Sequence, residues 1–271
     1  MSVYEEALQV AVRAAIQAGH LIKMHAGKIN EGQIRLKNVH DLVTEIDEQS
    51  QKIIVASLLE AFPDSTIMAE EGDVFSKGNE KVKGLRWIID PIDGTTNFTH
   101  GMPPYAVSIG LEDNGELVAG VVLEVGKWEL FTAVKGGGLY VDGVRAGVSS
   151  ATALSDSLVV TGFPYKHFDH LEAYLSLLGD MLQSARGVRR TGSASVDLAY
   201  VAAGRFDGFF ETGLMPWDLA AGVLLINEAG GKVTNYADEP NRLFDKQVLA
   251  TNGKIHTQML DLVRVMKDIR L

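Results

Sequence analysis

The sequence predicts an α/β protein in which mixed β-sheets are layered between helices. Helical and strand-like patterns follow one another along the chain, which favours packed layers of both kinds. The chain has 271 residues, of which 46% are hydrophobic and 22% charged, so it can bury a sizeable core. No repeat, low-complexity tract or linker is visible. We therefore expect a single domain over 1–271, with a change of sequence texture near Ala151.

Two helices are predicted at the start of the chain. Apolar residues recur at helical spacing over 3–25, and Gly27 follows where a helix would end. The segment 28–40 has weak periodicity and mixed charge, which indicates an exposed loop. A second helix is expected over 45–62 because Pro63 would stop it.

Short apolar runs then predict strands. They cover 66–69, 85–89, 106–111, 117–125 and 128–134. Asn114-Gly115 predicts a tight hairpin, because both central positions of a type I′ turn need positive φ. The glycines at 136–138 lack the following helix of a dinucleotide-binding loop, so they too indicate a hairpin connection. Much of this first sheet should be antiparallel.

The second half alternates strands with helices. Strands are expected at 157–161, 206–211 and 247–251, and helices at 171–183, 196–203 and 217–228. A closing helix is expected over 255–267. This order fits mixed sheets packed between helices.

Charge and composition exclude several classes of function. The net charge of −10 argues against a nucleic-acid or anionic-membrane partner, since lysine and arginine neutralise phosphates in such complexes. With no cysteine, disulfides, thiolate nucleophiles and cysteine-zinc sites are excluded. Glu5 and Glu6 stand where a signal peptide would be positive, and no apolar run is long enough for a membrane span. We expect a cytoplasmic protein.

Acidic residues at predicted strand ends and helix starts form the most informative pattern. Asp90 and Asp93 follow the apolar strand that ends at Ile89. The other members of the pattern are Glu70 and Glu71 after the strand 66–69, Asp47 near a helix start, and Asp218 at another helix start. Two carboxylates about 4 Å apart repel by roughly 4 kcal/mol at an effective dielectric near 20. Divalent cations would turn that repulsion into attraction, and an all-oxygen ligand set favours Mg²⁺ or Mn²⁺ over zinc.

The residues after Asp90 suit a phosphate. Pro91 fixes its own φ and biases Asp90 toward an extended conformation, so that Asp90, Asp93 and the Ile92 carbonyl can face one cavity. Gly94 lets the backbone approach a bound anion. A helix starting at Thr95 and Thr96 would offer free N–H groups to it.

At these residues the chain resembles the inositol monophosphatase family, among the magnesium-dependent, lithium-sensitive phosphatases, and in particular the bacterial inositol-1-monophosphatases. The resemblance rests on four segments in the family's order and spacing: 41–47, Ala69-Glu70-Glu71-Gly72, 87–98, and Trp217-Asp218 through Glu228-Ala229-Gly230-Gly231. It covers nearly the whole chain. The implied fold is a layered αβαβα sandwich, and family members usually form homodimers.

The resemblance implies two or three magnesium ions. One would be bound by Glu70, Asp90 and the Ile92 carbonyl, and a second by Asp90, Asp93 and Asp218. A looser third ion would lie near Glu70, and Mn²⁺ could substitute. Thr95, hydrogen-bonded to Asp47, would act with Glu70 to activate the water that attacks phosphorus in line.

The resemblance also implies the substrate contacts. Gly94 and Thr95 would hold the phosphate, and the hydroxyls of a sugar or cyclitol would meet a second group of residues. That group comprises Asp93, Ser193, Ala194, Glu211 and Arg189. Ser193 also fits a helix N-cap. The implied substrate is a small phosphorylated polyol or sugar, most specifically a myo-inositol monophosphate, which would be hydrolysed to myo-inositol and phosphate.

Other interpretations stay open. Relatives with the same metal site act on fructose 1,6-bisphosphate, histidinol phosphate or nucleotide phosphates. A haloacid-dehalogenase-type phosphatase also places an aspartate before glycine-threonine, but only one residue separates its two aspartates, whereas Pro91 and Ile92 both intervene here. From a different class, the chain could be a non-catalytic metal-dependent interaction protein.

Overall fold

The computed structural model describes residues 2–28, 34–38, 41–71, 83–164, 168–240 and 243–268. Its helices are α1 (Val3–His25), α2 (Glu45–Ala61), α3 (Thr95–Thr99), α4 (Leu171–Ser184), α5 (Ala194–Ala202), α6 (Pro216–Glu228) and α7 (His256–Val263). Single 3-10 turns lie at η2 (Leu154–Asp156) and η3 (Arg264–Met266). In the described part of the chain, no helix is both long and apolar enough to cross a membrane.

The strands form two large sheets and one hairpin. The 7-stranded sheet contains, in spatial order, β3 (Thr66–Ala69), β4 (Leu85–Asp93), β5 (Ala106–Asp113), β6 (Glu116–Glu124), β7 (Glu129–Val134), β8 (Gly138–Val141) and β9 (Val144–Ala146). The 5-stranded sheet has the order β11 (Gly187–Arg189), β10 (Leu158–Thr161), β12 (Gly208–Thr212), β14 (Gln247–Thr251) and β13 (Lys232–Thr234). The hairpin pairs β1 (Ile34–Asn38) with β2 (Asp41–Thr44).

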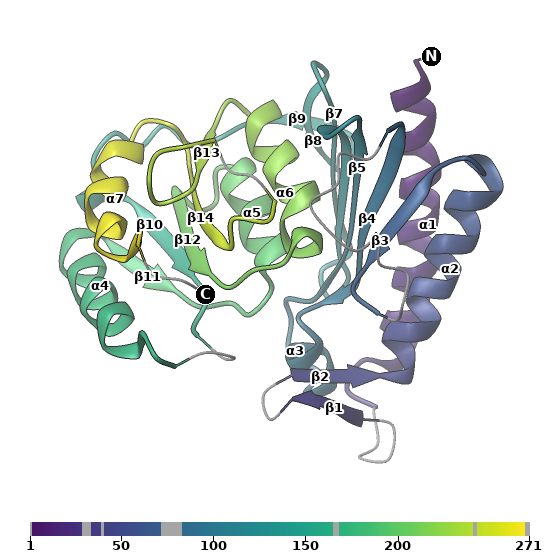
Figure 1. Ribbon diagram of the computed structural model, residues 1–271, viewed down its shortest axis with the longest axis horizontal. Helices are drawn as coiled ribbons and strands as arrows, with labels where there is room; N and C mark the ends of the chain where they lie inside the picture. Colours follow the sequence, from purple (N-terminus) through teal and green to yellow (C-terminus); the bar gives the residue numbers. More distant parts are fainter. Residues whose placement is uncertain are drawn as a thin grey trace.

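Helices and sheets alternate in five layers, as the resemblance implies (Figure 1). Helices α1 and α2 cover the outer face of the 7-stranded sheet, and α5 and α6 lie between the two sheets. Helices α4 and α7 cover the far face of the 5-stranded sheet. Both sheets are mixed: β3 pairs with β4 in parallel while the rest of the first sheet is antiparallel, and β10 pairs in parallel with β11 and β12. The αβαβα architecture is confirmed.

Near Ala151 the sequence changes from mostly strand-like runs to alternating strands and helices. This point lies where the chain leaves one sheet and enters the other. The chain leaves the first sheet after β9 and enters the second at β10. Helix α6 contacts strands of both sheets. We therefore propose that the two halves fold as one domain.

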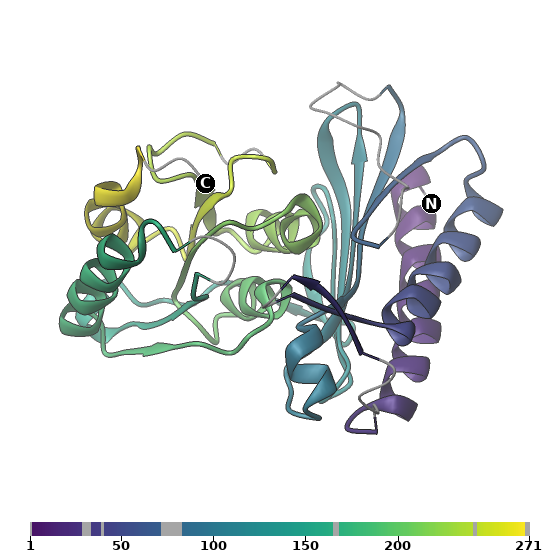
Figure 2. The same ribbon diagram turned by 60° about the horizontal axis from the view of Figure 1, so that its bottom comes forward.

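The predicted loop 28–40 is partly wrong. Residues 34–38 form β1, which pairs antiparallel with β2, and residues 29–33 and 39–40 lie outside the described residues. The sequence does alternate apolar and polar residues at 34–37, but four residues are the minimum for a strand signal, and the flanking mixed charge favoured a loop. The hairpin lies beside α3 (Figure 2). It therefore flanks the segment that carries Thr95.

The strand predicted to end at Ile89 continues to Asp93. Its pairing with β5 joins Asp90 to Ser108 and Asp93 to Ala106, with an irregularity between them. Pro91 has no N–H to donate, and proline within a sheet is confined to edges and bulges. The bulge turns Asp90 and Asp93 toward a common point, because extra residues in a strand re-aim its side chains.

Several predicted turns are confirmed, and several short strands went unpredicted. Asn114 and Gly115 have φ of 52° and 87° and join β5 to β6, and the glycines at 136–138 join β7 to β8. The closing helix is shorter than expected, since α7 ends at Val263 and η3 follows. Strands β8, β9, β11 and β13 were not predicted, because they have only three or four residues and lack the continuous apolar run that marks β3 and β10.

A pair of glycines sets the depth at which α6 lies on the 7-stranded sheet. Gly110 of β5 and Gly120 of β6 are direct cross-strand partners. A Cβ on Gly110 would lie 2.6 Å from the Ala220 Cβ, and one on Gly120 would lie 3.0 Å from the Ala221 carbonyl oxygen. The absence of two side chains thus makes a groove for α6, which begins two residues before Asp218.

Gly110→Ala is expected to lower the free energy of unfolding by about 1–3 kcal/mol, because a buried methyl group would overlap the helix. It should also weaken Mg²⁺ binding by displacing Asp218. Urea denaturation and calorimetric titration measure the two effects. Gly179→Ala is the matched control: nothing lies within 4 Å of the added methyl, so it should not destabilise. A Gly110→Ala protein with unchanged stability would refute this role of the groove.

Candidate active site

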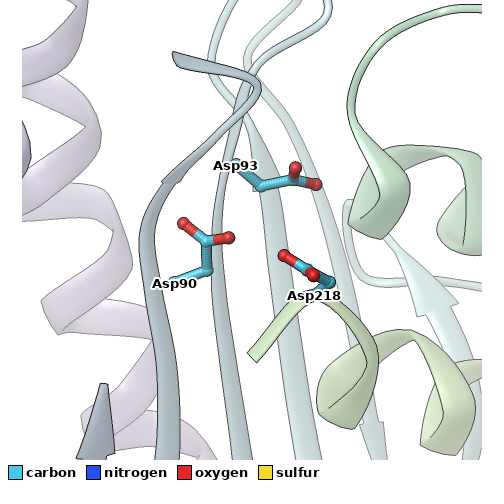
Figure 3. A group of neighbouring side chains, drawn as sticks. All are labelled: Asp90, Asp93 and Asp218. Atoms are coloured by element: carbon cyan, nitrogen blue, oxygen red, sulfur yellow. The ribbon is translucent and has the colours of Figure 1, made fainter. Parts of the chain in front are cut away.

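Three aspartates converge where β4 meets the start of α6. Asp90 and Asp93 come from the bulged end of β4, and Asp218 lies in the first turn of α6, after Pro216. Figure 3 shows the three side chains facing one another. One carboxylate oxygen of each lies within 4.8 Å of the others. The convergence expected from the sequence is therefore present for these three.

Asp93 is held by the residues that begin α5. Its Oδ2 accepts hydrogen bonds from the Ser193 hydroxyl (2.7 Å), the Ser195 N–H (2.6 Å) and the Ser195 hydroxyl (2.6 Å). Ser193 occupies the N-cap position, but its hydroxyl bonds to Asp93 and makes no capping bond. The backbone N–H of Ala194 also bonds to this carboxylate. The start of α5 therefore fixes the orientation of Asp93.

Local backbone groups fix the other two carboxylates. Asp90 Oδ1 accepts the Ile92 N–H at 3.0 Å. Asp218 Oδ2 accepts the Met215 N–H at 2.7 Å, so Asp218 caps α6 while it points into the site. Proline at the first turn costs the helix nothing, because that N–H has no helical partner.

The electrostatics of this cluster favour the binding of a cation when the carboxylates are ionised. Burial raises the pKa of Asp90 well above its usual value, and the charges of Glu70, Asp93 and Asp218 raise it further. Burial also raises the pKa of Asp93, against the hydrogen bonds from Ser193 and Ser195 that lower it. Asp90 is 1% exposed. Ionised carboxylates this close and this buried are stable only beside positive charge, and their oxygen atoms fit Mg²⁺ or Mn²⁺.

Asp47 and Thr95 form a pair beside the cluster. Asp47 completes the capping box of α2, where its Oδ2 accepts the Thr44 N–H (2.9 Å) and hydroxyl (2.5 Å). Its Oδ1 lies 3.1 Å from the Thr95 hydroxyl, which is also 3.0 Å from the Ile92 carbonyl oxygen. Burial raises the pKa of Asp47 to about 6. The hydroxyl thus lies between two acceptors next to the metal-ligand candidates.

Gly94 shapes the backbone after Asp93. Its φ is 90°, and a Cβ there would lie 3.1 Å from the carbonyl oxygens of both Gly192 and Pro104. Glycine is therefore required at this position. The helix expected at Thr95 exists, but α3 ends at Thr99. A single turn has little macrodipole, so any phosphate contact would rest on individual N–H groups.

These groups line a cavity of about 190 Å³. Among the predicted residues, the cavity lining includes Glu70, Asp90, Ile92, Asp93, Gly94, Thr95, Ser193, Ala194, Glu211 and Asp218. Asp47 does not line it and reaches it only through Thr95. Glu71 is buried beside Gln51, which accepts its N–H at 2.9 Å, and does not line the cavity.

The structure does not bring Arg189 to this cavity. Arg189 is exposed at the end of β11, and its neighbour Arg190 lines the cavity instead. Strand residues alternate between faces, so a choice between adjacent arginines depends on the register of β11. Sequence reasoning also missed Asp197, a buried residue in the first turn of α5 that lines the cavity. Its only signal was an aspartate among apolar residues in a predicted helix.

Comparison with known proteins agrees with this geometry. The model of the inositol monophosphatase family matches residues 3–267. The chain belongs to the inositol monophosphatase family. An inositol-1-monophosphatase of Mesorhizobium japonicum is 42% identical over 258 residues, covering 95% of this chain and 96% of that protein. The Nus factor SuhB of Pseudomonas aeruginosa is 41% identical over 259 residues, covering 95% of both.

Solved structures of family members share the fold. The extragenic suppressor protein suhB of Bartonella henselae superposes with a TM-score of 0.88 at 38% identity, covering 96% of this chain and 98% of that chain. The Thermotoga maritima IMPase superposes with a TM-score of 0.87 at 36% identity, covering 98% and 100%. Membership supports a phosphatase that acts on small phosphorylated substrates. The family depends on magnesium in general, and the acidic triad fits such an ion.

Proposed function

We propose that the protein hydrolyses myo-inositol monophosphate to myo-inositol and phosphate in a Mg²⁺-dependent reaction. The observation that carries this proposal is the convergence of Asp90, Asp93 and Asp218 within 4.8 Å in one cavity with Gly94 and Thr95. Two or three Mg²⁺ ions would be held there, with Mn²⁺ as a substitute. When bound, the ions supply a Lewis acid for the phosphate and lower the pKa of water.

The chain's own residues hold and orient the reacting groups. Glu70, Asp90, Asp93, Asp218 and the Ile92 carbonyl provide the oxygen ligands for the ions. The N–H groups of Gly94 and Thr95 bind phosphate oxygens at the positive-φ turn. Water then attacks phosphorus in line with the departing alcohol, without a phosphorylated protein side chain.

Thr95 and Asp47 would take up the proton of the attacking water, which passes to the Thr95 oxygen as the hydroxyl proton of Thr95 passes to Asp47 Oδ1. The Thr95 hydroxyl can donate to Asp47 Oδ1, 3.1 Å away, and so presents its oxygen lone pairs to the water. Proton transfer through a positioned side chain of this kind contributes about 10²–10⁴-fold in rate. Asp47 is buried and fixed by Thr44, so it orients the hydroxyl without contacting the substrate.

The surroundings of Glu211 favour a substrate that carries hydroxyl groups. It is 8% exposed at the end of β12, and no described residue donates a hydrogen bond to its carboxylate. A buried carboxylate without a donor is costly, and the hydroxyls of a polyol would satisfy it. Asp93, Ser193 and Ala194 lie on the same cavity wall and would meet neighbouring hydroxyls.

Side-by-side kinetics test the choice of substrate. We expect kcat/KM to be highest for a myo-inositol monophosphate and lower for fructose 1,6-bisphosphate, histidinol phosphate and nucleotide phosphates. An equal or higher kcat/KM on any of these three would overturn the substrate assignment but not the assignment of the protein as a phosphatase. No phosphate release from any of them with Mg²⁺ would overturn both. A trapped acyl phosphate on Asp90 would favour the haloacid-dehalogenase mechanism.

A role besides hydrolysis is the second candidate. Some relatives are named Nus factor SuhB, and this name does not mention a phosphatase activity. A non-catalytic interaction protein would not need the intact acidic ligands found here, which supports the enzyme. We also propose that the protein is a cytoplasmic homodimer with no nucleic-acid and no membrane partner. Light scattering of the purified protein would measure the oligomeric state.

Lithium provides an independent prediction. If the ion held by Asp90, Asp93 and Asp218 leaves late in turnover, Li⁺ can occupy its place and trap the product complex. Millimolar Li⁺ should then lower kcat and KM together, which is uncompetitive inhibition with respect to substrate. Initial rates over a grid of substrate and Li⁺ concentrations measure this. A rate indifferent to Li⁺ would count against the second-metal assignment.

A further inference from the structure

Three charged residues of the cavity lining are not among the metal-ligand candidates. Among the described residues that line the cavity, Arg190 is the one cation. Asp197 and Glu211 line the same cavity, and the charge of Asp93 raises the pKa of both. Arg190 lowers the pKa of both acids, against the burial that raises it. The three side chains therefore act on one another electrostatically.

Arg190 is held at the cavity mouth. Its guanidinium lies 5.6 Å from the ring centroid of Phe163, an exposed residue after β10, in cation–π geometry. A Cβ on Gly192 would lie 2.6 Å from Arg190 Nη1, so the glycine leaves room for the guanidinium. The charge is thus placed by contacts on two sides.

Asp197 is fixed more tightly. It is 1% exposed, and its Oδ1 accepts the Thr191 hydroxyl at 2.5 Å. The Thr191 carbonyl oxygen in turn accepts the Asn97 side-chain N–H at 2.9 Å, which connects this wall to α3. Glu211 lies against Gly162, where a Cβ would overlap its carboxylate, and it accepts no hydrogen bond from any described residue. Of the two acids, only Asp197 therefore has a hydrogen-bond donor within the described part of the chain.

We propose that Arg190 and Asp197 are specificity-determining residues that balance their charges at the leaving-group end, so that the site selects phosphomonoesters whose remaining part is uncharged. This rests on the proposed function. The charges of Asp197 and Arg190 offset each other, and Glu211 is left to accept hydroxyls. A second phosphate would be repelled by the two carboxylates, and the Arg190 guanidinium limits the attraction that these carboxylates would exert on an ammonium group.

The proposal is tested with three substrates on three proteins: the unchanged protein, Asp197→Asn and Arg190→Gln. The substrates are a myo-inositol monophosphate, fructose 1,6-bisphosphate and histidinol phosphate, whose second groups are neutral, anionic and cationic. Asp197→Asn keeps an acceptor for Thr191 and removes one negative charge. It should raise kcat/KM for the bisphosphate relative to the inositol ester about tenfold. Arg190→Gln should lower that ratio and raise the relative kcat/KM for histidinol phosphate by a similar factor.

Arg190→Lys is the matched control, because it keeps the charge while it loses the planar contact with Phe163. It should preserve the substrate ranking of the unchanged protein. Thermal unfolding of each variant shows whether it is folded. Substrate ratios that stay within about twofold in folded Asp197→Asn and Arg190→Gln proteins, or that fall equally for all three substrates, would overturn the proposal.

Equilibrium binding separates this proposal from the proposed function. Calorimetric titration of the same three compounds with Mg²⁺, on a Thr95→Val background in which turnover is slow, gives their Kd values without catalysis. The Asp197→Asn and Arg190→Gln changes should shift the ranking of Kd in the directions given above. Absence of hydrolysis in the unchanged protein would defeat the proposed function alone, whereas an unshifted ranking would defeat the charge-balance proposal alone.

Discussion

Asp93→Asn is expected to abolish Mg²⁺-dependent phosphate release, with kcat/KM reduced about a thousand-fold or more. Asp93 is a ligand candidate whose carboxylate is oriented by Ser193 and Ser195, and the variant removes its negative charge from the metal site. The loss corresponds to several kcal/mol of transition-state charge stabilisation. A phosphate-release assay over a range of Mg²⁺ concentrations measures it.

Thermal unfolding gives the same variant a second readout. Mg²⁺ should raise the Tm of the unchanged protein, because an ion that binds only the folded state stabilises it. The rise should be much smaller for Asp93→Asn. Asp180→Asn, at an exposed position in α4, serves as the control for loss of one negative charge. Full activity of Asp93→Asn, or equal Mg²⁺ stabilisation of both proteins, would show that the triad is not the metal centre.

Thr95→Val is expected to lower kcat by about 10²–10⁴-fold while KM changes little. Valine has the shape of threonine but no hydroxyl, so the link from Asp47 Oδ1 to the cavity is lost. The phosphate-binding N–H of residue 95 remains. Steady-state kinetics with saturating Mg²⁺ separate the two parameters.

Thr95→Ser is the partner variant, since it restores the hydroxyl without the methyl group. Its kcat should lie within about tenfold of the unchanged protein. If valine and serine reduce kcat equally, the hydroxyl takes no part in proton transfer and Thr95 serves only to shape α3. A rise in KM with unchanged kcat would instead assign Thr95 to substrate binding.

The long elements of the fold could be predicted because their patterns extend over many residues. Helix α1 repeats its apolar face over six turns, and the hairpin at Asn114-Gly115 has a turn whose backbone only certain residues adopt. The β1–β2 ribbon could not be predicted in the same way. The segment Ile34-Arg35-Leu36-Lys37 does alternate apolar and polar residues, but over four residues only. A two-stranded ribbon has no further strand whose pattern would reinforce so short a signal.

The same distinction applies to the site. Asp90 and Asp93 were predictable because the apolar run before them makes solvent exposure improbable. Arg189 was named in place of Arg190, because one residue of register in a three-residue strand decides which side chain enters the cavity. In the sequence, Asp197 is a single acidic residue in a predicted helix. Its burial and its hydrogen bond from Thr191 arise only from tertiary packing, so they could not be predicted.

The groove made by Gly110 and Gly120 links packing to the choice of ion. Ala220, which lies over Gly110, is two residues from Asp218, or roughly 3 Å along the helix axis. Bonds from oxygen to Mg²⁺ and to Ca²⁺ differ by only about 0.3–0.5 Å. A single methyl group at Gly110 would therefore shift Asp218 enough to change the size of ion that the site binds, although the methyl group does not contact the metal. Selectivity for a small ion would then be maintained at positions that have no functional group at all.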